Sequence, residues 1–114
     1  MVRKFTQVRW RPGKLGTAAV EPEDVVQARR EIRLSMALAR AVYERRVELG
    51  LTQSQLAERA GLTQAKVSRI EGSDTVPTLP SLSKLAHALD ASLDIALDGD
   101  ETRVSFTPHK TDAA

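Results

Sequence analysis

The chain has 114 residues, of which 41% are hydrophobic and 28% are charged, so it can form one small globular domain but not two independent cores. It contains no Cys, which excludes disulfide scaffolds, thiolate zinc sites and thiol catalysis. No apolar run approaches the roughly 20 residues of a membrane span, and no apolar stretch typical of a secretory signal follows the first basic residues. We therefore expect a cytoplasmic protein that does not contact membranes.

Charge is distributed unevenly along the chain. The net charge is only +2, yet residues 1–16 have a net charge of +5 and residues 73–114 have a net charge of −4. We interpret residues 1–20 as a basic flexible arm, which is either a solvated tail or an additional contact to an anionic partner such as DNA. The acidic C-terminal part is expected to face away from such a partner.

A long helix is predicted between Glu21 and Gly50, either continuous or as two abutting helices. Pro22, Glu23 and Asp24 are typical of a helix N-terminus, and good helix formers follow without interruption. The apolar residues form two sets, namely Val25, Ile32, Met36, Ala39, Tyr43 and Val47, and Leu34, Leu38, Val42 and Leu49. Together they exceed what one small core needs, so either residues 21–34 bind a partner or both sets face one intramolecular core.

Three short helices are predicted next, each preceded by a capping residue. They cover residues 53–60, capped by Thr52 in a capping box with Gln55; residues 64–71, capped by Thr63; and a fourth segment that begins at Thr78 or Ser81 and ends near Asp90.

A β-hairpin is predicted over residues 92–107, because the apolar period changes from 3.6 to 2 after the fourth helix. A turn at Gly99 and Asp100 places Ile95 opposite Val104 and Leu93 opposite Phe106, so the apolar side chains share one face. An isolated hairpin is marginal in water, so this face must lie on the helices or join a sheet of a second subunit. Residues 108–114 are expected to be a disordered tail.

Residues 51–73 contain the motif with the clearest function. They form two capped short helices joined by a turn at Gly61, and Ala57 is small where the helices approach each other most closely. The outward side chains of the second helix are predicted to be Gln64, Ala65, Lys66 and Arg69. Long hydrogen-bonding side chains near a helix N-terminus suit base edges and phosphates in a DNA major groove.

This segment resembles the helix-turn-helix of the phage repressor and Cro family, also called the XRE type, over about residues 35–90. The resemblance implies a mainly α fold, with a repressor-like DNA-binding domain over residues 35–91. The hairpin over residues 92–107 is one candidate dimerisation element, and the sequence leaves open which surface forms the dimer. The resemblance also implies that the DNA-binding residues are Gln53, Thr63, Gln64, Ala65, Lys66, Ser68 and Arg69. Gln53 matches a residue that binds phosphate, and Ser68 is expected either to bind phosphate or to pack.

Two further details follow from this resemblance. Arg46 and Glu71 match a family pair that forms a partly buried structural salt bridge. Ala65 departs from family members that carry Gln at this position, which limits base reading there to apolar contact, for example with a thymine methyl.

The flanking segments are similar to those of HigA-type antitoxins, which neutralise a ribonuclease toxin and repress their own operon. We therefore predict a sequence-specific repressor, the antitoxin of a toxin–antitoxin module, that binds a pseudo-palindromic double-stranded operator as a homodimer. Its half-sites are expected about 34–36 Å apart. The alternatives are a solitary XRE-type regulator without a toxin, or mainly a protein-binding neutraliser whose residues 1–34 wrap a toxin.

An enzymatic function is not predicted. The two histidines, His87 and His109, accompany no nucleophile–base arrangement and no paired metal-ligand spacing. A polar hairpin turn accounts for the acidic residues near Gly99, whose spacing lacks the EF-hand pattern. We expect no catalytic residues, no metal site and no cofactor.

Overall fold

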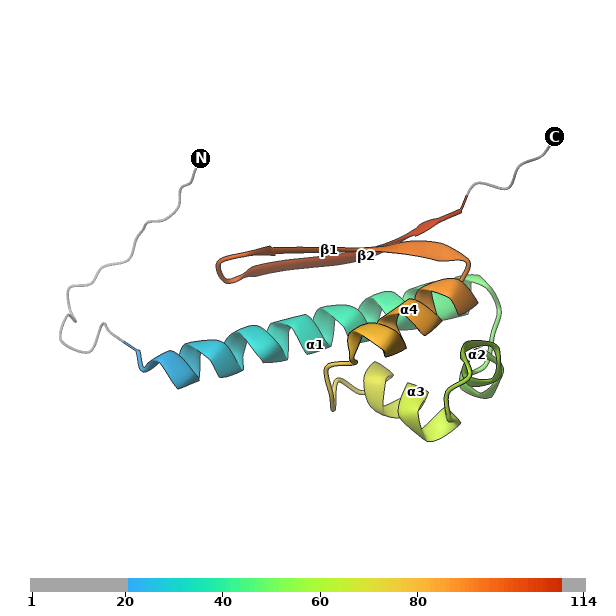
Figure 1. Cartoon of the computed structure of the whole chain (residues 1–114), viewed down its shortest axis with the longest axis horizontal. Helices are drawn as coiled ribbons and strands as arrows, with labels where there is room; N and C mark the ends of the chain where they lie inside the picture. The colour runs from blue at the N-terminus through green and yellow to red at the C-terminus, as the bar shows by residue number, and fades with distance from the viewer. Residues whose placement is uncertain (1–20, 110–114) are drawn as a thin grey trace.

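The computed structural model describes residues 21–109, which form four helices followed by a two-stranded antiparallel sheet. The helices are α1 (Glu23–Glu48), α2 (Gln53–Ala60), α3 (Gln64–Glu71) and α4 (Leu79–Ala88), and the strands are β1 (Ala91–Asp98) and β2 (Glu101–Pro108) (Figure 1). The predicted mainly α fold with a C-terminal hairpin is therefore confirmed. The basic arm predicted over residues 1–20 lies outside the described residues. Within residues 21–109, no helix combines the length and the hydrophobicity that a membrane crossing requires.

The predicted long helix is one continuous helix, α1. It begins after Pro22, with Glu23 and Asp24 in its first turn, where negative charge interacts favourably with the helix dipole. Arg45 and Arg46 lie in the last turn, where positive charge is favourable. Gly50 follows in the left-handed region with a φ of 72°, which lets the chain turn sharply toward α2.

Threonine side chains cap the three short helices. Thr52 Oγ1 accepts a hydrogen bond from the Gln55 N–H at 3.0 Å, and Gln55 Oε1 accepts one from the Thr52 N–H at 2.9 Å, so the predicted capping box is confirmed. Thr63 Oγ1 accepts from the Lys66 N–H at 3.0 Å. Thr78, rather than Ser81, caps the fourth helix, and its Oγ1 accepts from the Ser81 N–H at 3.3 Å.

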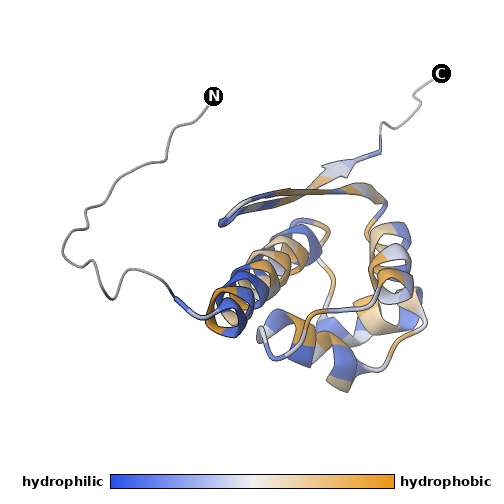
Figure 2. Ribbon diagram, turned by 60° about the vertical axis from the view of Figure 1, so that its left-hand side comes forward, coloured by the Kyte–Doolittle hydropathy of each residue, from blue (hydrophilic) through white to orange (hydrophobic). Residues whose placement is uncertain are grey.

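The hydrophobic core lies where α2, α3 and α4 meet the C-terminal half of α1. In Figure 2, α1 and α4 lie on opposite sides beneath the hairpin, and α2 and α3 lie below them. Buried Arg45 links α1 to the end of α4, because its Nε donates to the Leu89 carbonyl at 2.9 Å. The core residues are Val42, Leu56, Ala57, Ala60, Val67, Ile70, Leu85, Ala88 and Leu89.

The two apolar sets of α1 have different environments. Leu38 and Val42 are 1% and 0% exposed, whereas the larger side chains of the other set are about half exposed; these are Val25, Ile32, Met36, Tyr43 and Val47. The interpretation that both sets face one intramolecular core is therefore wrong. The reason is that α3 and β2 contact other faces of α1, and within residues 21–109 no element covers this one.

The hairpin has the predicted register, with Leu93 opposite Phe106 and Ile95 opposite Val104. β2 packs along α1 and β1 packs on α4, so the apolar face of the sheet lies partly on the helices. Ile95 and Leu97 nevertheless remain 38% and 67% exposed.

The ordered hairpin extends beyond its predicted end, so the prediction of a disordered tail from residue 108 is wrong at its first two positions. β2 continues to Pro108, and the His109 N–H donates to the Asp90 carbonyl at 3.1 Å. The His109 ring and the Asp90 carboxylate also lie 2.9 Å apart. Residues 108 and 109 are thus held by β1 and by Asp90, the residue that precedes it. The polar composition of the tail does not indicate these contacts.

Candidate nucleic-acid interface

The α2–turn–α3 unit presents one exposed face of α3. Gly61 ends α2 in the left-handed region with a φ of 71°, and the Leu62 N–H then donates to the Ala57 carbonyl at 2.9 Å. Val67 and Ile70 are 0% and 1% exposed and anchor the inner side of α3. The outer side is formed by Gln64, Ala65, Ser68 and Arg69, which are all exposed.

Two of the predicted DNA-binding residues on α3, Ser68 and Lys66, differ in how exposed they are. Ser68 is exposed in the middle of the outer face, so it does not pack against the core. Lys66 is only partly exposed and lies at the edge of this face, because it is one helical turn before buried Ile70. Capping residue Thr63 is exposed and directly precedes the helix. The structure therefore places these side chains together on one surface with Gln64 and Arg69.

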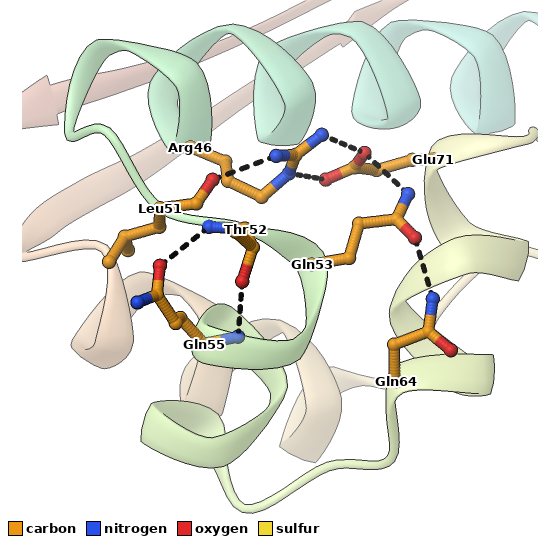
Figure 3. A network of polar contacts seen from close by, with 7 residues as sticks. All are labelled: Arg46, Leu51, Thr52, Gln53, Gln55, Gln64 and Glu71. Carbon is orange, nitrogen blue, oxygen red and sulfur yellow. Dashed lines mark hydrogen bonds and ion pairs between the residues drawn. The ribbon is translucent and has the colours of Figure 1, made fainter.

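Arg46 and Glu71 form an ion pair that connects α1 to the end of α3 (Figure 3). Arg46 Nε lies 2.7 Å from Glu71 Oε2, and Arg46 Nη2 lies 2.9 Å from Glu71 Oε1, so the pair is bidentate. The side chains are only 12% and 5% exposed. Arg46 Nη1 also donates to the Leu51 carbonyl at 2.8 Å, which ties the α1–α2 connection to the same point.

The environment of Arg46 keeps its guanidinium charged. The hydrogen bonds to Glu71 raise the pKa of Arg46 above its ordinary value, although partial burial opposes this effect. A raised pKa means that the contribution of this group to stability is complete below the unfolded pKa and is lost only as the pH rises through the folded value. Because that value lies far above neutrality, Arg46 stays charged throughout the physiological range.

Gln53 links this buried pair to the exposed face of α3. Its Nε2 donates to Glu71 Oε1 at 3.1 Å, and its Oε1 accepts from Gln64 Nε2 at 2.8 Å (Figure 3). A hydrogen-bonded series thus runs from Arg46 through Glu71 and Gln53 to Gln64, the first residue of α3. Sequence reasoning treated Gln53 only as a phosphate ligand and missed this link. One feature of the sequence could have indicated it. Both α2 and α3 begin with glutamine, and the turn between them brings the two N-termini close together.

We expect Gln53→Ala to weaken binding of duplex DNA at this face roughly 5-fold or more, because Gln64 loses a hydrogen bond of about 1 kcal/mol and Gln53 can no longer contact phosphate. Fluorescence anisotropy on labelled duplex DNA measures this loss. The matched control is Gln55→Ala, which removes the hydrogen bond from the Thr52 N–H to Gln55 Oε1 but keeps the one to Thr52 Oγ1. It is expected to lower the free energy of unfolding by about 1 kcal/mol while affinity is kept. Equal DNA affinities of Gln53→Ala and the unmodified protein would show that the link does not position Gln64.

The described residues offer little for metal chemistry. Within residues 21–109 no group of three or more His, Asp or Glu side chains is arranged to hold a metal ion. The polar groups that converge near α3 are instead amides, a hydroxyl and positively charged nitrogens, which are the groups that bind phosphates and base edges in DNA.

Comparison with known proteins also identifies a helix-turn-helix region in this chain. Residues 42–95 match the family model described as helix-turn-helix. A Haemophilus influenzae protein known as an uncharacterized HTH-type transcriptional regulator is 38% identical over 66 residues, which cover 58% of this chain and 67% of the relative. A Methanothermobacter thermautotrophicus protein of the same description is 42% identical over 48 residues, which cover 42% of this chain and 70% of the relative.

A solved structure shares the fold of about half of this chain. It is the crystal structure of a point mutant of the restriction-modification controller protein C.Esp1396I, with a TM-score of 0.50 and 29% sequence identity. The similarity covers 52% of this chain and 77% of the controller protein.

Proposed function

Because this chain belongs to the helix-turn-helix family of transcriptional regulators, we propose that it represses transcription by binding a specific operator as a homodimer. The observation that supports this most directly is the exposed face of α3, with Gln64, Ala65, Ser68 and Arg69 on a helix that is anchored on its inner side. A rigid helix with an outer face of this kind fits the major groove, which is wide enough to admit an α-helix.

Each side chain has a distinct role in the proposed complex. Arg69 and Gln64 present several N–H donors or amide groups, so we assign them to base edges. Ala65 contacts a thymine methyl or no base atom at all. The phosphate contacts come from Gln53, Thr63 and Lys66, which lie on or beside the N-termini of α2 and α3, and from Ser68 in the middle of the outer face of α3.

Operator binding is tested by titrating the protein onto its own promoter at several salt concentrations. We expect the affinity to fall as salt rises and to exceed the affinity for a scrambled duplex of the same length about 1,000-fold or more at physiological salt. Footprinting is expected to show two protected half-sites about 34–36 Å apart. Equal affinity for the promoter and the scrambled duplex would contradict a sequence-specific repressor.

The antitoxin function is a second candidate, supported by a hollow outside the α2–α3 unit. This hollow of about 350 Å³ lies between the predicted partner-binding segment and the hairpin, and its apolar walls are Leu34 and Leu97. Leu97, which lines this hollow, is 67% exposed to solvent. An apolar side chain of a toxin fits such a recess, while the DNA-binding face of α3 stays accessible. We favour the solitary regulator over the antitoxin, because the relatives described above are named as transcriptional regulators.

Co-expression with the adjacent reading frame distinguishes the two candidates. An antitoxin is expected to co-purify with that protein, and Leu97→Arg is expected to disrupt the complex while operator affinity is kept. A solitary regulator is expected to purify alone and to bind the same operator.

A further inference from the structure

The uncovered face of α1 carries a continuous apolar stripe. We define it as Val25, Ile32, Met36, Tyr43 and Val47, which follow one another at intervals of seven, four, seven and four residues and therefore lie on one line along the helix. Each side chain is between 45% and 59% exposed. Scattered apolar residues on a surface are ordinary, but a row of five along about 33 Å of one helix is typical of a helix-packing surface.

Charged residues beside the stripe suggest what covers it. Arg33 hydrogen bonds to the Asp100 carbonyl of the hairpin, and Glu44 and Glu48 line a hollow with residues of β2, so these side chains share the hairpin side of the stripe. Arg29 lies one helical turn before Arg33, so this side carries two arginines toward the N-terminus and two glutamates toward the C-terminus. Within the chain Arg29 pairs with Glu21, Glu44 with Arg40 and Glu48 with Arg45, so contacts to a second copy would add to or replace these pairs. Arg29 and Arg33 are four residues apart, as are Glu44 and Glu48, so both arginines can face both glutamates of an antiparallel copy at the same time.

We propose that the stripe is the dimer interface, in which α1 packs antiparallel against α1 of a second copy of this chain. One antiparallel register places Arg29 opposite Glu48 and Arg33 opposite Glu44 of the second copy. In the same register, Ile32 falls between Tyr43 and Val47 of the other helix, as knobs-into-holes packing requires, whereas Val25 lies beyond the end of the other α1. Each pairing occurs twice because the two-fold axis repeats it.

The positions of α3 and the hairpin also favour the antiparallel arrangement, a step that rests on the proposed function. On the side of the stripe opposite the hairpin, Ser35 hydrogen bonds to the Ser73 carbonyl, and Arg46 pairs with Glu71, so this side faces α3. Figure 1 shows the hairpin and α3 on opposite sides of α1. A two-fold axis perpendicular to α1 keeps both α3 helices on one side of the dimer, where one duplex reaches both. A parallel pair would direct them to opposite sides.

Sedimentation equilibrium of the full chain without DNA tests the interface independently of operator binding. We expect the unmodified protein to have twice the 12.5 kDa mass of the chain at micromolar concentration. Met36→Glu is expected to raise the dimer dissociation constant about 100-fold, because one charge per copy enters an apolar contact. Met36 is 57% exposed, so the monomer fold tolerates this change. Leu97→Glu is the control, since it adds the same charge to exposed apolar surface on the hairpin.

The antiparallel register has its own test. Arg33→Glu and Glu44→Arg are each expected to weaken the dimer, and the double variant is expected to restore it. These residues are about 16 Å apart along one helix, so restoration requires contact between copies. Failure of the double variant to recover would overturn the register. A monomeric unmodified protein, or dissociation by Leu97→Glu but not by Met36→Glu, would overturn the interface. Loss of a co-purifying protein on Met36→Glu, with the dimer intact, would assign the stripe to a toxin instead.

Failure of the proposed function gives a different result. Arg69→Ala is expected to leave the dimer mass unchanged while it weakens operator binding. A stable α1 dimer that binds no specific operator would retain the interface and overturn only the DNA-binding proposal.

Discussion

Replacing Glu71 with alanine is expected to lower the free energy of unfolding by about 3 kcal/mol, which is near the lower end of the range for breaking a buried ion pair. Glu71 is 5% exposed, and its removal leaves the Arg46 guanidinium with the Leu51 carbonyl as its remaining hydrogen-bond partner in the network of Figure 3. The lower end applies because Arg46 keeps 12% of its side-chain surface in solvent. Chemical denaturation at one fixed protein concentration measures the change.

The matched control for this prediction is Glu58→Ala. Glu58 is an exposed glutamate on α2, and its loss is expected to change the free energy of unfolding by no more than about 0.5 kcal/mol. A double variant lacking both Arg46 and Glu71 is expected to lose less than the sum of the two single variants, since neither charge is then left buried alone. Similar losses for Glu71→Ala and Glu58→Ala would contradict a structural role of the pair.

Arg69→Ala is expected to weaken operator binding by about 1–3 kcal/mol, or roughly 5- to 150-fold, if Arg69 reads a base edge as proposed. The loss is expected to be largest on the best operator and small on a scrambled duplex, so that discrimination between the two falls. Anisotropy titrations on a set of single-base operator variants measure both effects and identify the base pair that Arg69 reads.

Two further variants separate base reading from general electrostatic attraction. Arg103→Ala removes the same charge from the exposed hairpin, and we expect it to change operator affinity little. Lys66 lies at the edge of the α3 face, so Lys66→Ala is expected to weaken binding to all sequences alike and to reduce the salt slope by about one. Unchanged affinity in both Arg69→Ala and Lys66→Ala would contradict the assignment of α3 as the recognition helix.

Local signals in the sequence predict most of the secondary structure. Thr52, Thr63 and Thr78 lie at the cap positions of α2, α3 and α4, and Gly61 lies where a left-handed residue ends α2. The alternation on either side of Gly99 predicts the hairpin and its register, because a one-residue shift would move every apolar side chain to the other face. These features depend on residues within a few positions of one another, so they can be read without knowing the tertiary structure.

The candidate site is predicted less completely. The pattern of apolar residues identifies α3 and the surface that carries Gln64 and Arg69, since Val67 and Ile70 must face inward. It does not distinguish the exposed position of Ser68 from the edge position of Lys66, and it does not reveal that Gln53 connects Gln64 to Glu71. Those properties depend on the crossing angle of α2 and α3 and on how closely α1 packs against them. Neither can be predicted from the pattern of residues within one helix.

The sequence by itself therefore determined the order of the elements, their limits to within a few residues, the capped helix-turn-helix and the pairing of the hairpin. Only the tertiary structure decided which apolar set of α1 is buried, because both sets have helical spacing and equally hydrophobic side chains. Leu38 and Val42 enter the core, whereas Met36 and Tyr43 remain outside it. The difference arises from where α3 and β2 contact α1, and these contacts join residues that are far apart along the chain.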